Sequence, residues 1–374
     1  MKNDAGEVGF KVLVGGGMGR TPIIGSVIRE FLPWNQILVY LEAIVRVYNR
    51  YGRRDNAYKA RIKILVKAEG QKYFDQVEAE FRQILEDDPD GTLHLIPQAE
   101  LDRVAACFAR PAGVEPLPET GLPADLPLAY RRWIERNVHA HQVPGWRAVT
   151  LSVKRAGQAP GDATDVQLDA AADLADRYSF GELRVTHDQN LLLPWVKASD
   201  LPAVHAAAKA AGYATPNIGL VTDMIACPGG DFCDLANARS IPVAAELTER
   251  FADLDEVFDL GEIDLHISGC INSCGHHHSG HIGILGVDKD GSEWYQVTLG
   301  GSDGSNHAPV AVPGKVIGPS FAASEITDAV EAILETYREQ RLGGEKFIDT
   351  LQRVGLDPFK AAANAQRTTT ARHA

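Results

Sequence analysis

Four cysteines that fall in two close pairs constrain this chain more than any other feature of its sequence. Cys227 and Cys233 form a Cys-x5-Cys pair, and Cys270 and Cys274 form a Cys-x3-Cys pair. Four paired thiols match a tetrahedral thiolate site, which in a cytosolic protein means zinc or an iron–sulfur cluster rather than disulfides. Structural zinc prefers pairs separated by two to four residues, whereas the wider, glycine-bearing pair suits a bulkier [4Fe–4S] cube. The spacing therefore favours a cluster, with zinc and free thiols as alternatives.

Other features of the sequence indicate the compartment in which those thiols stay reduced. The segment Met1–Glu7 lacks the apolar stretch of a secretory signal, and no uninterrupted apolar run approaches the roughly 18 residues of a membrane helix. We therefore expect a cytoplasmic protein with no membrane partner. The chain carries 37 Lys and Arg against 50 Asp and Glu, a formal net charge of −13. This balance argues against nucleic acid as a partner.

The fifth cysteine and a histidine-rich segment are further candidates for metal chemistry. Cys107 lies in an apolar stretch without a nearby partner, so we expect a small buried side chain. His276, His277, His278 and His281 directly follow the second cysteine pair. They could form a metal-binding tract of their own. Alternatively they occupy the loop that leaves the thiolate site, where some pack against it and others donate hydrogen bonds.

Two segments of the N-terminal region could together bind an anion. Residues 8–17 are typical of a buried strand that runs into a glycine-rich turn ending near Thr21, which is either a purely structural turn or a place of close approach to a ligand. Further on, a cationic segment stands out in an otherwise acidic protein. It is either a solvated helix face or an anion site, because guanidinium groups grip carboxylates in a bidentate manner. Its members are Arg53, Arg54, Lys59, Arg61 and Lys63.

The length of 374 residues fits two or three domains, and the patterning is α+β. A helix is predicted over 35–51, with Ile37, Leu41, Ile44 and Tyr48 on its buried face. The proline- and glycine-rich segment 111–127 predicts an exposed linker and a domain boundary. Beyond it, the expected elements are a strand from Trp146, a helix over 166–178, strands within 182–193, and helices over 200–211 and 324–341.

The cysteine segments carry a resemblance to a known family. Cys227-Pro-Gly-Gly-Asp-Phe-Cys233, followed by His266-Ile-Ser-Gly-Cys270-Ile-Asn-Ser-Cys274-Gly, resembles the paired cluster motif of the sulfite/nitrite reductases, which contain siroheme and a [4Fe–4S] cluster. The resemblance covers essentially the whole chain. It extends to Gly15–Pro22, Tyr51–Arg61, Gln189-Asn190, Leu299–Gly301 and Phe347–Leu356.

The resemblance implies an architecture as well as a site. It implies an α+β chain equivalent to the C-terminal portion of the nitrite/sulfite reductase fold, with one ferredoxin-like "parachute" half-domain and siroheme/4Fe–4S α/β domains. The implied divisions are a siroheme-contacting domain over 1–119, the ferredoxin-like half over 120–198, a 4Fe–4S/siroheme domain over 199–360 and a disordered tail over 361–374.

The resemblance also implies which residues hold the cofactors. Cys227, Cys233, Cys270 and Cys274 would bind the cube, and the Cys274 thiolate would also be the proximal ligand of the siroheme iron. Asn272 matches the middle position of the family's usual Cys-Pro-Asn-Gly-Cys, from which Ile271 and Ser273 depart. Because siroheme carries eight carboxylates, the cationic residues gain a ligand. The implied cofactor contacts are Arg20, Arg53, Arg54, Lys59, Arg61, Lys63, Gln189, Asn190 and Asn272.

The implied activity is the six-electron reduction of sulfite to sulfide, or of nitrite to ammonia, with sulfite preferred. No flavin or nicotinamide fingerprint is visible, so electrons are expected from a separate ferredoxin or NADPH flavoprotein. Relative to the family, the chain is expected to lack the N-terminal half that supplies most substrate-binding cations. A second polypeptide would then provide that half. The alternatives are a truncated, non-catalytic product that binds the cluster or siroheme, and a zinc-stabilised binding module.

Overall fold

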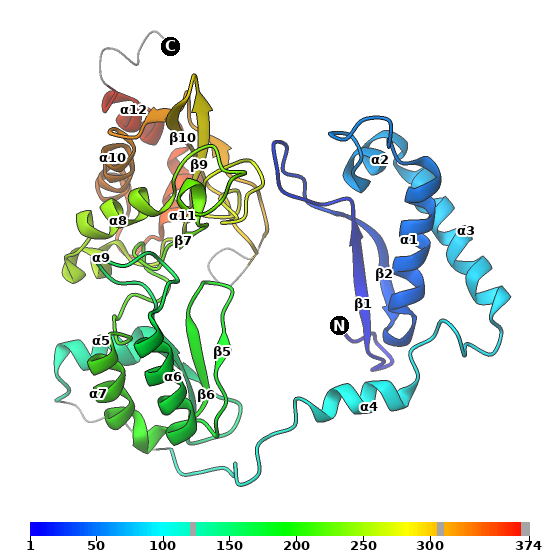
Figure 1. The fold of residues 1–374 in the computed structure, drawn as a ribbon, viewed down its shortest axis with the longest axis horizontal. Coiled ribbons are helices and arrows are strands. Elements are labelled where there is room, and N and C mark those ends of the chain that lie inside the picture. The colour runs from blue at the N-terminus through cyan, green and yellow to red at the C-terminus, as the bar shows by residue number, and fades with distance from the viewer. Residues whose placement is uncertain (120–124, 305–309, 368–374) are drawn as a thin grey trace. The chain divides into compact units, whose positions relative to one another are not determined.

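The computed structural model describes residues 1–119, 125–304 and 310–367. It divides into two compact units, Met1–Ala112 and Gly113–Ala374. The boundary between them lies inside the proline- and glycine-rich segment 111–127. Both units combine helices with sheets, which confirms the predicted α+β class (Figure 1).

The first unit is a two-stranded antiparallel sheet covered by helices. Its core combines apolar residues of both strands with those of α1, α2 and α3, because each helix turns one apolar face inward. In α1 the buried residues include Val39, Tyr40 and Val47, whereas Leu41 of the predicted face is exposed. The elements are β1 (Gly9–Val14), β2 (Ser26–Pro33), η1 (Trp34–Gln36), α1 (Ile37–Tyr51), α2 (Ile62–Glu69), α3 (Gln71–Asp87) and α4 (Gln98–Ala106).

Cys107 is exposed, so its predicted burial is wrong. It is the C-cap of α4, a helix of nine residues in which no residue is buried. The apolar residues around it therefore do not form a buried stretch.

The second unit begins with a four-stranded antiparallel sheet in the order β3-β4-β6-β5. Helices α5, α6 and α7 contribute to one core with this sheet. A capping box at Thr164, in which its side chain accepts from Gln167 N, starts α6 at the residue before the predicted helix. The elements are α5 (Leu128–Asn137), β3 (Val138–Ala140), β4 (Trp146–Leu151), α6 (Asp165–Tyr178), β5 (Arg184–Val185), β6 (Leu191–Lys197), η2 (Ala198–Asp200) and α7 (Leu201–Ala211).

A larger mixed sheet follows, with the order β11-β10-β9-β8-β7 and β12 paired to β10. Strands β7, β8 and β9 are parallel to one another, and β9 and β10 form an antiparallel hairpin. Helices α8 to α12 share one apolar core with this sheet. The elements are β7 (Ile225–Ala226), η3 (Gly229–Asp231), α8 (Ile241–Arg250), α9 (Leu254–Leu260), β8 (Leu265–Ser268), β9 (Ile282–Lys289), β10 (Ser292–Leu299), β11 (Lys315–Val316), β12 (Phe321–Ala322), α10 (Ile326–Gln340), α11 (Phe347–Val354) and α12 (Asp357–Ala365).

Two segments are more ordered than the sequence predicted. Within the expected linker, Val114 is buried against Trp146, whose indole nitrogen donates to Glu115 O at 2.9 Å. The expected tail begins inside a helix, because α12 runs to Ala365, and the buried Arg367 donates to Ser320 O at 2.7 Å. The remainder of that tail, residues 368–374, lies outside the described residues. In the described parts of the chain, no helix is both long and apolar enough to cross a membrane.

A buried ion pair joins the smaller sheet to the segment that leads into the larger one. Lys154 Nζ lies 3.1 Å from Asp223 Oδ1, and the two side chains are only 1% and 5% exposed. Asp223 also accepts from Asn190 Nδ2 at 2.9 Å and from Gly219 N at 3.0 Å. The carboxylate is thus shared between residues from both sides of the junction.

Replacing Asp223 with alanine should destabilise the chain by about 3–5 kcal/mol, because it leaves Lys154 charged and unpaired in the interior. Urea denaturation followed by circular dichroism measures the loss. Glu100→Ala is the matched control, because it removes a carboxylate from an exposed pair with Arg103, and its midpoint should match that of the parent chain. Equal midpoints for Asp223→Ala and Glu100→Ala would contradict the importance of the buried pair.

Candidate functional site

The paired cysteines lie where two neighbouring parallel strands end. Cys227 directly follows β7, and Cys270 comes two residues after β8, with Ala226 paired to Ile267. Because parallel strands end at the same edge of a sheet, this pairing brings the two cysteine segments together. Cys227 N donates to Ile267 O at 3.1 Å, which extends the pairing up to the cysteine itself.

One backbone amide and one hydroxyl contact the sulfur of Cys227. Gly269 N donates to Cys227 Sγ at 3.1 Å, and Ser240 Oγ lies 3.5 Å from the same sulfur. The short 3-10 helix η3 carries the chain from the first cysteine to the second, and Cys233 N donates to Gly229 O at 2.9 Å. Hydrogen bonds to a thiolate favour its charged form and tune the potential of a bound metal centre.

The second cysteine pair lies on a tight loop with unusual backbone geometry. Ser273 and His276 have φ of 59° and 53°, in the left-handed region that residues other than glycine rarely adopt. Gly275 permits a close approach to β8, because a Cβ there would lie 2.0 Å from Ile267 O. Its amide donates to Ser268 Oγ at 3.1 Å, which ties the loop back to β8.

The four thiols are close enough to influence one another electrostatically. Burial, and then the nearby Cys227, Cys270 and Cys233, raise the pKa of the Cys274 thiol, because neighbouring thiolates repel its charged form. A cation at the site would reverse that repulsion. Within residues 1–119, 125–304 and 310–367, no three His, Cys, Asp or Glu side chains lie close enough to hold a single metal ion.

The histidines after the second pair are mostly interior packing and hydrogen-bonding groups. His277 is fully buried, its Nδ1 lies 3.1 Å from Ser273 Oγ, and its ring lies 3.9 Å from that of His278. Burial, followed by the neighbouring His278, His266 and His276, lowers the pKa of His277 to about 3. His281 accepts from Asp264 N through Nδ1 at 3.2 Å. These contacts favour the interpretation that the histidines belong to the loop that leaves the thiolate site. They do not favour a separate metal-binding tract.

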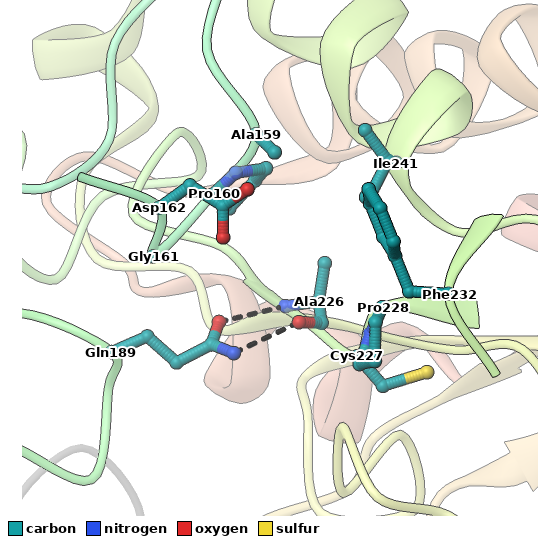
Figure 2. A pocket seen from close by; sticks show the side chains of 10 residues that line it. All are labelled: Ala159, Pro160, Gly161, Asp162, Gln189, Ala226, Cys227, Pro228, Phe232 and Ile241. Atoms are coloured by element: carbon teal, nitrogen blue, oxygen red, sulfur yellow. Dashed lines mark hydrogen bonds between the residues drawn. The ribbon is translucent and has the colours of Figure 1, made fainter. Parts of the chain in front are cut away.

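Gln189 and Asn190 direct their amides at protein groups beside the cysteines. The Gln189 side chain bonds to both backbone groups of Ala226, and Asn190 Oδ1 accepts from Val153 N at 2.9 Å. Gln189 and Cys227 also line a cavity of about 100 Å³ (Figure 2). Asn272 is exposed between the second pair of cysteines. The direct cofactor contacts of these three residues stay predictions.

In the first unit, the structure brings part of the cationic segment to the glycine-rich turn. Lys63 Nζ donates to Met18 O at 2.7 Å and to Thr21 O at 2.8 Å, so its ammonium holds the turn. Arg61 donates to Ala60 O at 2.8 Å. The other cationic residues lie on the surface. Arg53 pairs with Asp55, and Arg54 bonds Asn49 and lies over the Tyr48 ring. Arg20 and Lys59 are exposed. Their role as an anion site stays a prediction.

Sequence reasoning missed three residues that shape the site. The first is Ser240, whose hydroxyl lies beside Cys227 Sγ. The second is Ser268, which accepts from Gly275 N in the loop of the second cysteine pair. The third is Asp223, which accepts from Asn190, the residue after Gln189. Ser268 lies two residues before Cys270, and its place at the end of a strand could have indicated a loop-binding hydroxyl. Ser240 and Asp223 show no such signal, because each bonds a residue far away in the sequence and no local pattern marks the pair.

Comparisons with known proteins identify the family of the chain. The family model of the nitrite and sulphite reductase 4Fe-4S domain matches residues 1–85 and 220–370, and that of the nitrite/sulfite reductase ferredoxin-like half domain matches 139–211. The chain is 26% identical over 363 residues to "Sulfite reductase [ferredoxin] 2" of Mycolicibacterium paratuberculosis. It is 27% identical over 360 residues to the "Assimilatory ferredoxin-dependent nitrite reductase" of Haloferax mediterranei.

These similarities cover nearly all of the chain but little more than half of the relatives. Each relative aligns with 94% of the chain, which spans 57% and 56% of their respective lengths. The solved structure of the Mycobacterium tuberculosis NirA protein superposes with a TM-score of 0.65 at 25% identity, covering 94% of this chain and 58% of that one. The predicted domain limits at 119, 198 and 360 stay predictions, and one family model covers segments on both sides of the half-domain.

The left-handed conformation of Ser273 should separate two substitutions. Ser273→Ala loses the hydrogen bond to His277 and keeps the strain, so it should destabilise the chain by about 1–3 kcal/mol. Ser273→Gly loses the same bond but relieves the strain, so it should be about 1 kcal/mol more stable than Ser273→Ala. Urea denaturation of the reduced chain measures both values. A glycine variant less stable than the alanine variant would contradict the left-handed backbone.

The lowered pKa of His277 should make stability depend on pH. Below about pH 6.5 the unfolded chain binds a proton that the folded chain excludes until about pH 3. The contribution is therefore complete above about pH 6.5 and declines by about 1.4 kcal/mol for each unit below it. Urea denaturation at about pH 7 and about pH 5 should show a steeper loss for the parent chain than for His277→Asn. Parallel losses in the two proteins would rule out His277 as the source.

Proposed function

The chain belongs to the nitrite and sulphite reductase family, and from that premise we propose that it binds a [4Fe–4S] cluster and siroheme and serves sulfite or nitrite reduction. The observation that carries the proposal is the convergence of the two cysteine pairs at one edge of the sheet, where Ala226 pairs with Ile267 and Gly269 N donates to Cys227 Sγ. A bound cationic centre stabilises thiolates that lie this close together. The coupled cofactors supply, when bound, the one-electron steps that the six-electron reduction requires.

The cysteines differ in exposure in a way that supports different roles. Cys270 is buried, Cys227 and Cys233 are half-buried, and Cys274 is exposed. A thiolate that bridges the cube to a second iron needs an accessible side, which Cys274 has. Gly269 N–H stabilises the negative charge on the Cys227 sulfur. We therefore assign Cys274 as the thiolate shared with the siroheme iron.

The cationic residues of the first unit supply the charge that siroheme carboxylates require. Arg20, Arg53, Arg54 and Lys59 are exposed and can turn toward an anion, although Arg53 must exchange its Asp55 partner. Lys63 and Arg61 support these residues indirectly, because they bond backbone carbonyls close to them in the chain. Lys63 bonds Met18 O, and Arg61 bonds Ala60 O.

The names of the relatives support a ferredoxin donor and include both candidate substrates. The names of two relatives specify ferredoxin, one as a sulfite reductase and one as a nitrite reductase. We propose ferredoxin as the donor and sulfite as the preferred substrate. Because the chain spans little more than half of those relatives, turnover should need the rest of their length, present in a longer chain or in a second polypeptide.

Anaerobic purification with quantification of iron, acid-labile sulfide and siroheme tests the proposal. The parent chain should hold about four irons and four acid-labile sulfides for one cube, about one further iron for siroheme, and a siroheme absorption band. Cys274→Ser should lose the coupling between the two cofactors, because a hydroxyl is a far poorer bridge than a thiolate. Cys107→Ser is the matched control, because Cys107 lies outside the constellation and is exposed, and its content should equal that of the parent.

Zinc without iron would overturn the proposal and would instead support a zinc-stabilised binding module. Equal cofactor loss in Cys107→Ser and Cys274→Ser would overturn the assignment of the bridging thiolate. Cofactors in normal amount without sulfite or nitrite turnover would support the requirement for the remaining length of the relatives.

A further inference from the structure

The Gln189 side chain bonds to both backbone groups of the residue that precedes the first paired cysteine. Its amide nitrogen donates to Ala226 O at 2.9 Å, and its amide oxygen accepts from Ala226 N at 3.1 Å. Figure 2 shows both bonds and the position of Cys227 immediately beyond them. A neighbouring strand would satisfy Ala226 with the same pair of bonds, so the Gln189 amide substitutes for a strand.

Strand β7 needs this support because it is short and marginal. It has two residues and stands at one end of the strand order. Cys227 N–H points to β8, where it bonds Ile267 O. Because successive residues of a strand alternate the direction of their backbone groups, the N–H and C=O of Ala226 point to the opposite side. Gln189 bonds them there and holds β7 from the side that β8 does not reach.

Neighbouring contacts hold Gln189 itself in place. Its φ of 57° is left-handed, a strained conformation that persists only where the surroundings enforce it. Asn190, the next residue, is only 2% exposed and is bonded to Val153 and to Asp223 of the buried ion pair. The loop at Gly161 packs so closely that a Cβ there would lie 2.9 Å from Gln189 Cβ.

We propose that Gln189 is a positioning residue for the Cys227 thiolate, an inference that rests on the proposed cluster. By fixing Ala226, the amide keeps Cys227 Sγ at the point where Gly269 N–H donates to it. Hydrogen bonds to a ligand sulfur set the reduction potential of an iron–sulfur centre. Gln189 therefore tunes the cluster from the ferredoxin-like half through its bonds to Ala226.

Two variants of Gln189 and one matched control test the inference. Gln189→Ala removes both bonds, and Gln189→Glu keeps an acceptor for Ala226 N but faces Ala226 O with negative charge. Asn137→Ala is the control, because Asn137 is a buried carboxamide of the same half that bonds Thr150 O and Thr215 O and nothing in β7. All three should lower the melting temperature, so stability alone does not distinguish them.

The first measurement is hydrogen exchange in the metal-free chain. In Gln189→Ala, the Ala226 amide should exchange roughly tenfold faster relative to the core amide of Ile284, because it has lost its acceptor. Asn137→Ala should leave that ratio unchanged. An unchanged ratio in Gln189→Ala would overturn the inference whatever the cofactor content, so its failure is separate from that of the proposed cluster.

The second measurement is the reduction potential of the reconstituted cluster. Gln189→Glu should lower the potential, because a carboxylate next to the Cys227 strand disfavours the added electron, and Asn137→Ala should match the parent. A potential in Gln189→Glu equal to that of the parent would reduce Gln189 to a structural support and overturn its positioning role. A parent chain that takes up no iron would count against the proposed function instead.

Discussion

Repulsion between four thiolates is the constraint on which the rest of this site depends. Like charges held close together disfavour one another, and at Cys274 burial and then the three neighbouring cysteines raise the pKa of the thiol. The fold must therefore hold the four sulfurs together before a cofactor binds, on a frame rigid enough to keep them from moving apart. That frame is the parallel pairing of β7 with β8, since both cysteine segments leave it at the same edge.

The frame gains its rigidity from the layers behind it rather than from β7. Strand β8 continues into β9 and β10, whose apolar residues are buried against helices α8 to α12. On this base the loop after β8 adopts left-handed geometry at Ser273 and His276, which the Ser273 to His277 contact helps to compensate. Strain of this kind survives only where packing over-determines the backbone. The cysteine loops are thus shaped before any cofactor enters them.

The sequence predicts the parts of the site that depend on spacing and misses those that depend on a long-range contact. Cysteine spacing indicated the constellation, and hydrophobic periodicity located the helices near 166–178, 200–211 and 324–341. The motif Gln189-Asn190 was visible, but its partners, Ala226 and Asp223, were not, because a side chain that bonds a distant backbone leaves no periodic signal. The burial of Cys107 was predicted from apolar neighbours, and it failed because its helix buries none of its residues.

The two bonds from Gln189 to Ala226 lower the ordering cost of binding the cluster. A metal centre that must order its own ligands loses binding free energy to that ordering, so a preformed ligand strand binds more tightly. Gln189 transfers this ordering cost to the folding of the ferredoxin-like half, where the buried pair of Lys154 with Asp223 and the amide of Asn190 already fix the loop. Folding of that half and retention of the cluster are then linked through one residue, Ala226. This linkage gives a physical reason for the half-domain to be packed against the cysteine segments, because a partly folded half-domain would leave the Cys227 thiolate free to move away from its Gly269 donor.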